Sequence, residues 1–266
     1  SSRCVSCGAC KKACSYQNGI SLHEPIRAYA AVNKTQQQLE KSASGGAFSA
    51  VATYFLKNES VVYGAALDFE GGHPIAHLVG IDDASQLWRL QGSKYVQSAV
   101  EQTYKQAKQN LDAGKKVLFS GTPCQIAGLY GYLKKEYANL WTIDVICHGV
   151  PNLKFFDDYL SIEGKKRGGV PTGYSFRDKK RGWGMNARLD LRYLSGKEKS
   201  TYIPARLTSY NTLFLDGDVY RENCYACPYA RKERVSDMTI GDFWGIEREH
   251  PELLKQSEFD EKKGIS

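Results

Sequence analysis

Residues 117–124 read Val-Leu-Phe-Ser-Gly-Thr-Pro-Cys, and residues 141–149 read Trp-Thr-Ile-Asp-Val-Ile-Cys-His-Gly. Each stretch is a short apolar run that ends in a cysteine, as expected of a buried strand followed by a turn. A helical pattern over 125–137 lies between them, as expected of strands and helices that alternate in an α/β sheet. Open α/β sheets bind ligands at the carboxyl ends of their strands. The sequence therefore predicts a mixed α/β (α+β) fold with Cys124 and Cys147 at one sheet edge.

The pattern on either side of these strands extends the same fold. A small-residue loop over 41–46 precedes a helix over 47–56, and hairpin signals join 187–193 to 200–203. Further strands are expected at 28–32, 61–66, 75–79 and 238–240, and further helices at 84–90, 100–111, 155–162 and 211–215. We expect two parts: a small cysteine-rich segment over 1–24, and a large catalytic domain over 25–266 that follows it.

The first cysteine set is a ferredoxin-like run at the N-terminus. Cys4, Cys7, Cys10 and Cys14 have the spacing C-x₂-C-x₂-C-x₃-C, which suits a 4Fe–4S cluster better than zinc. Ser15 stands where ferredoxins usually have proline, and in two-cluster ferredoxins the fourth cysteine ligates the other cluster. Cys14 is therefore either the fourth ligand of a local cluster or a ligand of another one.

The second cysteine set is dispersed over Cys124, Cys147, Cys224 and Cys227. Taken singly, Cys124 and Cys147 are typical of small buried apolar residues. The C-x₂-C at Cys224 and Cys227 is a stronger metal-binding signal. Residue chemistry leaves three alternatives open for this set: an iron–sulfur cluster, a structural zinc ion or a dithiol redox pair.

Composition excludes several other classes of protein. The net charge of +7 is modest, and basic clusters at 179–181 and 231–234 have neither the stripe nor the stacking aromatics of a nucleic-acid site. They are expected to be solvated faces, or else a docking surface for an acidic cofactor or redox partner. No apolar run is long enough to span a membrane, and no signal region precedes the cysteines. Unpaired cysteines of this kind predict a cytoplasmic protein.

Six motifs make the chain recognisable, and together they cover nearly all of it. They are Lys-Ser-Ala-Ser-Gly-Gly-Ala-Phe (41–48), Gln-Gly-Ser-Lys-Tyr-Val-Gln-Ser (91–98), Phe-Ser-Gly-Thr-Pro-Cys-Gln (119–125), Cys-His-Gly-Val-Pro (147–151), Ser-Phe-Arg-Asp-Lys (175–179) and Ser-Asp-Met-Thr-Ile-Gly-Asp-Phe-Trp-Gly (236–245). In these the chain resembles the coenzyme F-420 hydrogenase/dehydrogenase β-subunit family in its bacterial form, with a ferredoxin-like N-terminus.

The resemblance implies a flavin- and iron–sulfur-dependent oxidoreductase. Family members bind FAD and exchange electrons between it, 4Fe–4S clusters and a redox partner such as ferredoxin or a deazaflavin coenzyme. The dispersed cysteines match the family's own cluster ligands, so two clusters are expected. Electrons would pass from a small redox substrate through FAD to the cluster on the dispersed cysteines, and then to the N-terminal one. Oligomerisation is left open.

The resemblance also implies which residues bind the flavin. They are Ser42, Ser44, Gly45, Gly46, Gly92, Ser93, Lys94, Tyr95, Gln97 and Thr122. Adjacent glycines let backbone N–H groups approach a phosphate or the flavin edge. Lys94 is the candidate to pair with the pyrophosphate or polarise the flavin. Without the resemblance, residues 44–46 would be an ordinary loop and Tyr95 a core residue.

His148 is a candidate proton donor, although a hydrogen-bonded structural histidine is an equal interpretation. Two alternatives to the enzyme remain: a non-catalytic electron-transfer subunit without flavin, and a zinc-stabilised binding protein. Ferredoxin-like members carry two cysteine runs and this chain has one, so a fragment that has lost the second is one interpretation. Residues 263–266 are expected to begin a further strand.

Overall fold

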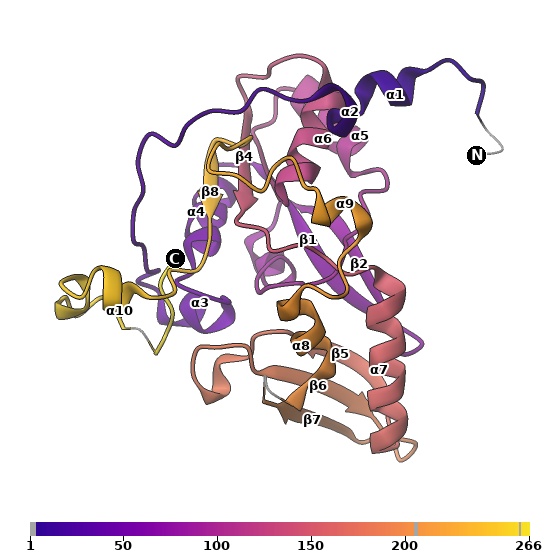
Figure 1. Ribbon diagram of the computed structural model, residues 1–266, viewed down its shortest axis with the longest axis vertical. Coiled ribbons are helices and arrows are strands. Elements are labelled where there is room, and N and C mark those ends of the chain that lie inside the picture. Colours follow the sequence, from indigo (N-terminus) through magenta and orange to yellow (C-terminus); the bar gives the residue numbers. More distant parts are fainter. Residues whose placement is uncertain (1–3, 205–206, 261) are drawn as a thin grey trace.

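Two β-sheets form the body of the molecule, one above the other in Figure 1. The computed structural model describes residues 4–204, 207–260 and 262–266. The N-terminal segment lies at the top of the upper layer, and a long extended stretch then runs down one side to the C-terminal residues. The chain is therefore a mixed α/β protein.

The upper sheet has five strands in the order β2-β1-β3-β4-β8. Their bounds are β1 Val61–Glu70, β2 His73–Ile81, β3 Val117–Gly121, β4 Leu140–Val145 and β8 Met238–Ile240. β1, β3, β4 and β8 are parallel, and β2 is antiparallel at the edge. Cys124 and Cys147 each follow a strand of this sheet, as predicted, and the structure shows that the two strands are parallel neighbours, with Phe119 paired to Thr142.

Helices cover both faces of this sheet because its central strands alternate between two apolar faces. Val117 and Phe119 pack toward α5 (Thr103–Asp112) and α6 (Pro123–Leu133). Leu118 faces the other way, into a cluster with α4 (Ala47–Leu56) and the 3₁₀ helix η1 (Ala84–Arg89). The segment predicted as a helix over 84–90 is thus a 3₁₀ helix, which begins after the capping carboxylate of Asp83.

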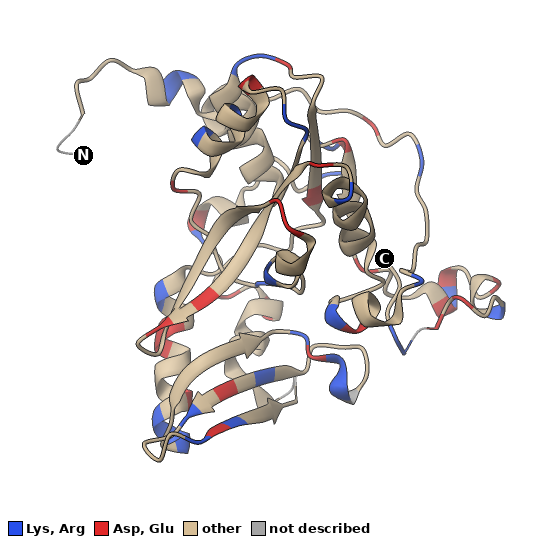
Figure 2. Ribbon diagram, turned by 180° about the vertical axis from the view of Figure 1, so that it is seen from behind, with Lys and Arg blue, Asp and Glu red and all other residues tan. Residues whose placement is uncertain are grey.

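The lower layer is a three-stranded antiparallel sheet with two helices on one face. Its strands are β5 Val170–Ser175, β6 Ala187–Arg192 and β7 Glu198–Ile203, and its helices are α7 Leu153–Arg167 and α8 Ser209–Asp216. Ala187, Leu189 and Leu191 are buried against the helices. The residues between them are charged and lie on the outer face, where Figure 2 shows basic and acidic positions alternating along the strand. The predicted hairpin is confirmed.

Short helices and an extended stretch complete the chain. They include α1 Ala9–Ala13, α2 Ser15–Asn18, α3 Gln36–Lys41, α9 Glu222–Tyr225, α10 Ile246–Glu249 and the 3₁₀ helices η2 Lys179–Arg181 and η4 Leu253–Lys255. No helix among the described residues is long and apolar enough to cross a membrane.

The strand predicted over 28–32 does not form. This stretch is extended, and only Ala31 pairs, through two backbone hydrogen bonds of 2.8 and 3.0 Å with Ser266. Local apolar composition suggested a strand, but the chain here runs along the outside of the body and its backbone pairs with the C-terminal residues (Figure 1). The residues predicted to begin a further strand at the C-terminus are its partner instead.

Candidate redox site

Cys124 and Cys147 lie at the same edge of the upper sheet because β3 and β4 are adjacent and parallel. Cys124 is in the first turn of α6, which begins with Pro123, and Cys147 lies two residues beyond β4. The side-chain oxygen of Gln125 accepts a 3.0 Å hydrogen bond from the N–H of Thr122, which fixes the start of α6. The Thr122 hydroxyl then lies 3.1 Å from the Cys124 sulfur.

The C-x₂-C motif reaches this edge from the other layer. After α8 the chain turns back, and the N–H of Arg221 donates to the carbonyl of Val150 at 3.1 Å. Helix α9 follows, with Cys224 inside it and Cys227 just beyond it. Cys227 packs against the apolar cluster under α5 and α6. Three separate chain segments thus bring their cysteines toward one place.

Electrostatic interactions among the four thiols indicate that they are neighbours. Desolvation raises the pKa of the Cys124 thiol, the Thr122 hydroxyl partly offsets this, and Cys227 and Cys224 raise it further. Desolvation likewise raises the pKa of Cys147 to about 11, with added repulsion from Cys124, Cys224 and Cys227. Cys124 and Cys147 are nonetheless accessible to solvent.

The separation of these thiols bears on the kind of metal centre that they could hold. Among the described residues, no three Cys, His, Asp or Glu side chains converge closely enough for a single metal ion. A tetrahedral zinc ion needs its thiolates at about 2.3 Å from one centre. In a cubane each thiolate binds its own iron at a different corner, so the sulfurs stand farther apart. The four dispersed cysteines are thus electrostatic neighbours that form no single-ion site among the described residues.

The N-terminal cysteines lie on a separate, more exposed segment. Cys4, Cys7 and Cys10 are exposed and Cys14 is half-buried at the junction of α1 and α2. The side-chain amide of Asn18 donates to the carbonyls of Lys11, Lys12 and Cys14 and holds this short turn together. The structure thus gives these residues a common segment without bringing three of them around one ion position.

Tyr229 lies between the two cysteine sets. Its hydroxyl donates to the carbonyl of Ser15 at 3.4 Å. Burial raises its pKa, and Cys124, Cys227 and Cys14 each contribute a further upward shift. Helix α6 makes the second link, since α2 packs against it and a side chain at Gly131 would overlap the carbonyl oxygen of Ala13. The N-terminal segment is therefore docked on the same helix that carries Cys124.

The two loops predicted to bind flavin lie beside each other. The amide of Gln91 donates to the side-chain oxygen of Gln38 at 2.7 Å, which joins the second loop to α3, just before the first loop. The second loop also contacts the segment that follows Cys147, since the N–H of Gln97 donates to the carbonyl of Pro151 at 3.0 Å. Gly92 has a φ of +77° and open space where a side chain would be.

The first loop is occupied by contacts of its own. The Ser42 hydroxyl donates to the carbonyl of Gln38, and that of Ser44 donates to the carbonyl of Ile265. A side chain at Gly45 would overlap the backbone of Ala31 and Ser266. Gly46, with a φ of +82°, begins α4. The glycines of this loop are thus explained by close packing of the chain against itself.

Lys94 is enclosed near the end of η1. Its Nζ donates to the carbonyls of Gln91 at 2.6 Å and Arg89 at 3.1 Å. Desolvation lowers its pKa to about 7, and Asp68 offsets this only in part. Ser93, the residue before it, is half-buried. Lys94 therefore titrates near neutral pH beside the open space at Gly92.

A row of aromatic rings connects the second of the loops predicted to bind flavin with the cysteine edge. Tyr95 stacks on Phe214 at 4.8 Å, and Phe214 contacts His148 edge-on at 5.4 Å. Nε2 of His148 lies 3.2 Å from the carbonyl oxygen of Leu215, as expected of a structural histidine. Tyr220 closes the row and contacts His148 at 5.5 Å. Sequence patterns gave no signal for Phe214 or Tyr220, because their partners come from distant segments.

A second cluster missed from the sequence joins two of the quoted motifs. Arg177 is buried and forms an ion pair with Asp242 at 2.5 Å. It lies near the stacked rings of Trp183 and Trp244, whose centroids are 3.8 Å apart. Lys179 donates to the carbonyls of Leu39 and Ser44, and desolvation lowers its pKa to about 8. These residues fasten the lower layer to the loop before α4.

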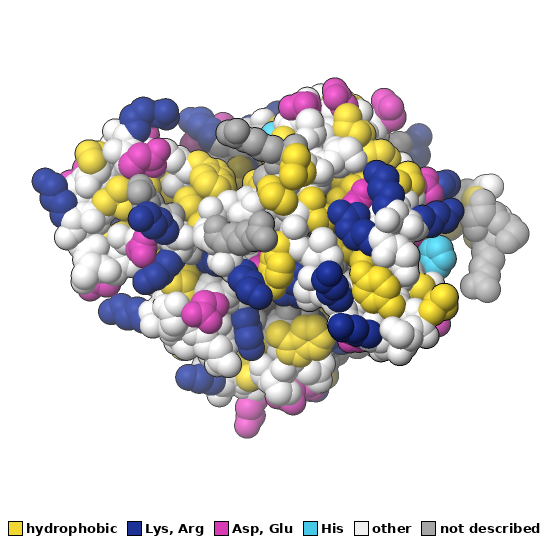
Figure 3. Space-filling model, turned by 90° about the horizontal axis from the view of Figure 1, so that it is seen from below, with side chains coloured by type: hydrophobic (Ala, Val, Ile, Leu, Met, Phe, Trp, Pro, Cys, Tyr) yellow, Lys and Arg dark blue, Asp and Glu magenta, His cyan; other side chains and the backbone are white. Residues whose placement is uncertain are grey.

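Basic and acidic side chains are mixed on the face of the molecule seen from below (Figure 3). Lys and Arg side chains recur across this face, with Asp and Glu interspersed (Figure 3).

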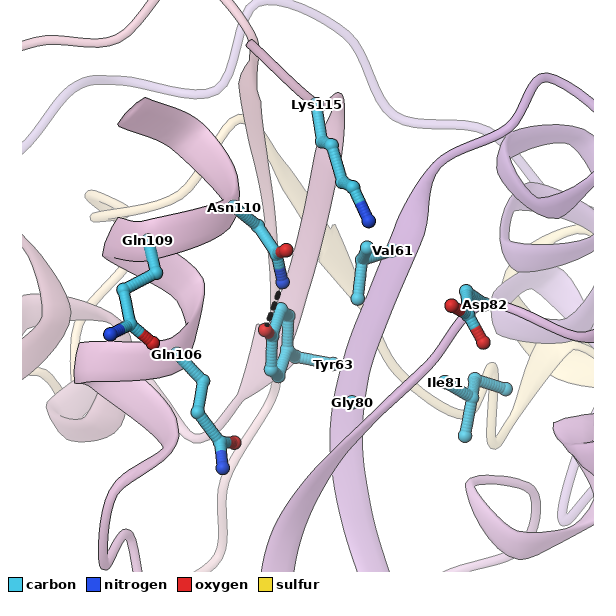
Figure 4. Close-up of a pocket in the computed structure, with 9 residues that line it drawn as sticks. All are labelled: Val61, Tyr63, Gly80, Ile81, Asp82, Gln106, Gln109, Asn110 and Lys115. Carbon is cyan, nitrogen blue, oxygen red and sulfur yellow. Dashed lines mark hydrogen bonds between the residues drawn. The ribbon is translucent and has the colours of Figure 1, made fainter. Parts of the chain in front are cut away.

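A polar pocket of about 310 Å³ lies on the side of the upper sheet, between β1, β2 and α5. Figure 4 shows Tyr63 there, which accepts a 2.7 Å hydrogen bond from Asn110, and Lys115 and Asp82 also line the pocket. It is lined by none of the cysteines or predicted flavin residues.

Two comparisons relate the chain to known proteins. Residues 114–264 match a family model that describes the C terminus of the beta subunit of coenzyme F420 hydrogenase/dehydrogenase. A solved structure from a xenon-derivatization study of the F420-reducing [NiFe] hydrogenase complex of Methanosarcina barkeri is similar in fold, with a TM-score of 0.51 and 15% identity. That match covers 82% of this chain and 72% of the other. No curated protein sequence matches the chain.

Proposed function

Because this chain belongs to the coenzyme F420 hydrogenase/dehydrogenase beta-subunit family, we propose that it is an FAD- and iron–sulfur-dependent oxidoreductase. The observation that carries the proposal is the meeting of Cys124, Cys147, Cys224 and Cys227, from three segments, beside the loop over 91–97. We propose that these four thiolates hold one 4Fe–4S cluster and that Cys4, Cys7, Cys10 and Cys14 hold another.

The chemistry of the pair of cofactors explains why one protein would bind both. When bound, FAD exchanges electrons in pairs with a small redox substrate and iron–sulfur clusters carry them singly. The substrate or partner that we propose is a deazaflavin-type coenzyme or a ferredoxin. The deazaflavin is favoured only by the description of the family, since none of the residues described above selects it.

The chain's own residues would orient and bind these groups. The Thr122 hydroxyl, 3.1 Å from the Cys124 sulfur, would fix the orientation of that thiolate. Gly92 leaves room for a ligand to approach the backbone, and Lys94 beside it would attract an anionic group such as a pyrophosphate. Tyr95 and Phe214 provide an aromatic surface between that ligand and the cysteine edge.

The test is cofactor content in the full chain, purified and reconstituted without oxygen. We expect FAD and about eight irons per chain, two cubanes' worth. The paired substitution Cys224→Ser and Cys227→Ser should reduce iron to about four and leave FAD in place. The matched pair Cys4→Ser and Cys7→Ser should remove the other half of the iron. Reduced F420 and reduced ferredoxin are then compared as electron donors to the flavin. Zinc in place of iron, with no flavin, would overturn the proposal.

A second candidate is an electron-transfer subunit that holds clusters but no flavin. It is favoured by the loop over 42–46, where Gly45 packs against Ala31 and Ser266 and Ser44 bonds to Ile265. These contacts explain the loop without any ligand. The same preparation separates the two candidates, because the second predicts full iron content and no bound FAD after reconstitution with an excess of it.

A further inference from the structure

Tyr220 has a fixed ring between the two chain segments that carry Cys147 and Cys224. Gly149 has a φ of +117°, and a side chain there would lie 2.8 Å from the Tyr220 ring, so the ring packs directly on the backbone of that glycine. His148 and Phe214 contact the ring edge-on, at 5.5 and 5.8 Å. These contacts on several sides leave the ring little freedom to rotate away.

The hydroxyl of Tyr220 is buried and has no hydrogen-bond partner among the described residues. A buried tyrosine hydroxyl normally finds a partner, since leaving one unsatisfied is unfavourable. The nearby Tyr225 does not serve, because its hydroxyl accepts from the Tyr220 backbone N–H and donates to the carbonyl of Gly217. An acceptor outside the protein chain would satisfy the group.

The ionisable groups that act on this hydroxyl include two thiols. Cys147, and to a lesser extent Cys224, interact with it electrostatically, as does Tyr225. A tyrosine hydroxyl keeps its proton at neutral pH and is therefore a donor. The sulfurs of a cluster held by these cysteines would carry negative charge and accept hydrogen bonds. The hydroxyl is thus a donor that is unpaired among the described residues, and its electrostatic neighbours include two of the four cysteines.

We propose that Tyr220 donates a hydrogen bond to a sulfur of the cluster on Cys124, Cys147, Cys224 and Cys227, and thereby raises its reduction potential. The proposal rests on the function proposed above. A hydrogen bond to sulfur stabilises the reduced cluster more than the oxidised one, since the reduced cluster carries one more negative charge. Tyr220 is then a tuning residue that touches the cofactor without binding iron.

The experiment compares wild type with Tyr220→Phe, in which only the hydroxyl is lost. Both are made in the Cys4→Ser, Cys7→Ser background, so that one cluster remains to titrate. The midpoint potential is measured by electron paramagnetic resonance during a reductive titration. We expect it to fall on substitution by on the order of 59 mV, the equivalent of about tenfold in a one-electron reduction constant. Resonance Raman spectra should show a shifted Fe–S stretch in the same variant.

Tyr174→Phe is the matched control. Tyr174 is also a buried tyrosine, and its hydroxyl has no hydrogen-bond partner among the described residues. It lies in β5, however, and the groups that act on it electrostatically are Tyr159, Tyr210 and Glu163. Its substitution should leave the potential unchanged. An unchanged potential in Tyr220→Phe, with iron content intact, would overturn this inference alone. Absence of a cluster from the wild-type site would overturn the proposed function as well.

Discussion

At the scale of single residues, Arg234 connects three parts of the protein. Its guanidinium donates to Asp144, which is fully buried in β4, at 2.7 Å. Its backbone forms two hydrogen bonds of 2.9 Å with His23, in the extended stretch after the N-terminal segment. One residue thus stabilises the segment after the C-x₂-C motif against both the sheet and the linker.

Arg234→Met should lower the free energy of unfolding by about 3–5 kcal/mol, because it leaves the Asp144 carboxylate buried and unpaired. Denaturant unfolding followed by circular dichroism measures the change. Arg192→Met is the control: Arg192 and Glu198 are paired on the outer face of the lower sheet and largely exposed, so its loss should cost about 1 kcal/mol or less. Equal effects of the two substitutions would contradict this assignment.

Lys94 gives flavin binding a predicted pH dependence. Its pKa is lowered to about 7 by burial, so the side chain is charged below this pH and neutral above it. A neutral amine has two N–H groups, which the carbonyls of Arg89 and Gln91 already use, whereas the charged form has a third to offer an anion.

FAD affinity, measured by flavin fluorescence, should therefore weaken as pH rises through about 7. Because a bound anion would stabilise the charged form, the midpoint should lie somewhat above that value. Lys94→Met should bind FAD more weakly at low pH and show no such slope. A wild-type affinity that is flat across this range would rule out a charged Lys94 as the anion partner.

At the scale of secondary-structure elements, α6 relates the two cysteine sets. Cys124 lies in its first turn and Gly131 two turns later, so the docked N-terminal segment is about 10 Å along the helix axis from Cys124. Glycine has a low helix propensity, so Gly131 by itself destabilises α6. Its presence is explained by the contact with Ala13, which no larger residue would permit.

Gly131→Val should displace α2 from α6 while leaving the rest of the fold in place. Hydrogen exchange of residues 9–18 should become faster, and that of β3 and β4 should not change. Tyr132→Ala, on the same helix but at a partly exposed position, should leave the N-terminal segment protected. Unchanged exchange in Gly131→Val would mean that this contact does not hold the segment.

At the scale of the whole molecule, the proposed cluster would join segments that bury little apolar surface between them. The chain from Gly217 to Arg234 contains little buried apolar surface apart from Tyr229. A cluster on Cys224, Cys227, Cys124 and Cys147 would cross-link this stretch to the upper sheet, and ligand binding to the folded state adds stability.

Chelation of iron without oxygen should therefore open this stretch first. Limited proteolysis of the iron-free protein should cut between residues 217 and 234 before it cuts either sheet, and reconstitution should restore protection. The variant with Cys4→Ser and Cys7→Ser, left untreated with chelator, keeps the cluster proposed on the dispersed cysteines and should resist cleavage there. Cleavage that is indifferent to iron would show that the stretch is held by protein contacts alone.

The elements that depend on local pattern could be predicted from the amino-acid sequence. The helix over 47–56, the strands around 117–120 and 141–146, and the hairpin over 187–203 follow from apolar periodicity and turn residues, and all are confirmed. The family followed from motifs, and the match over residues 114–264 confirms it. The cysteine spacing of the first set is likewise a property of the chain alone.

Contacts between residues far apart in the sequence could be identified only in the folded structure. The meeting of Cys124 and Cys147 with Cys224 requires the return of the chain from the lower layer, which no local pattern encodes. The stretch over 28–32 had strand-like composition, but its backbone pairs with the C-terminal residues rather than with a sheet. The unpartnered hydroxyl of Tyr220 arises the same way: a residue's chemistry is written in the sequence, but its neighbours are set by packing across the fold.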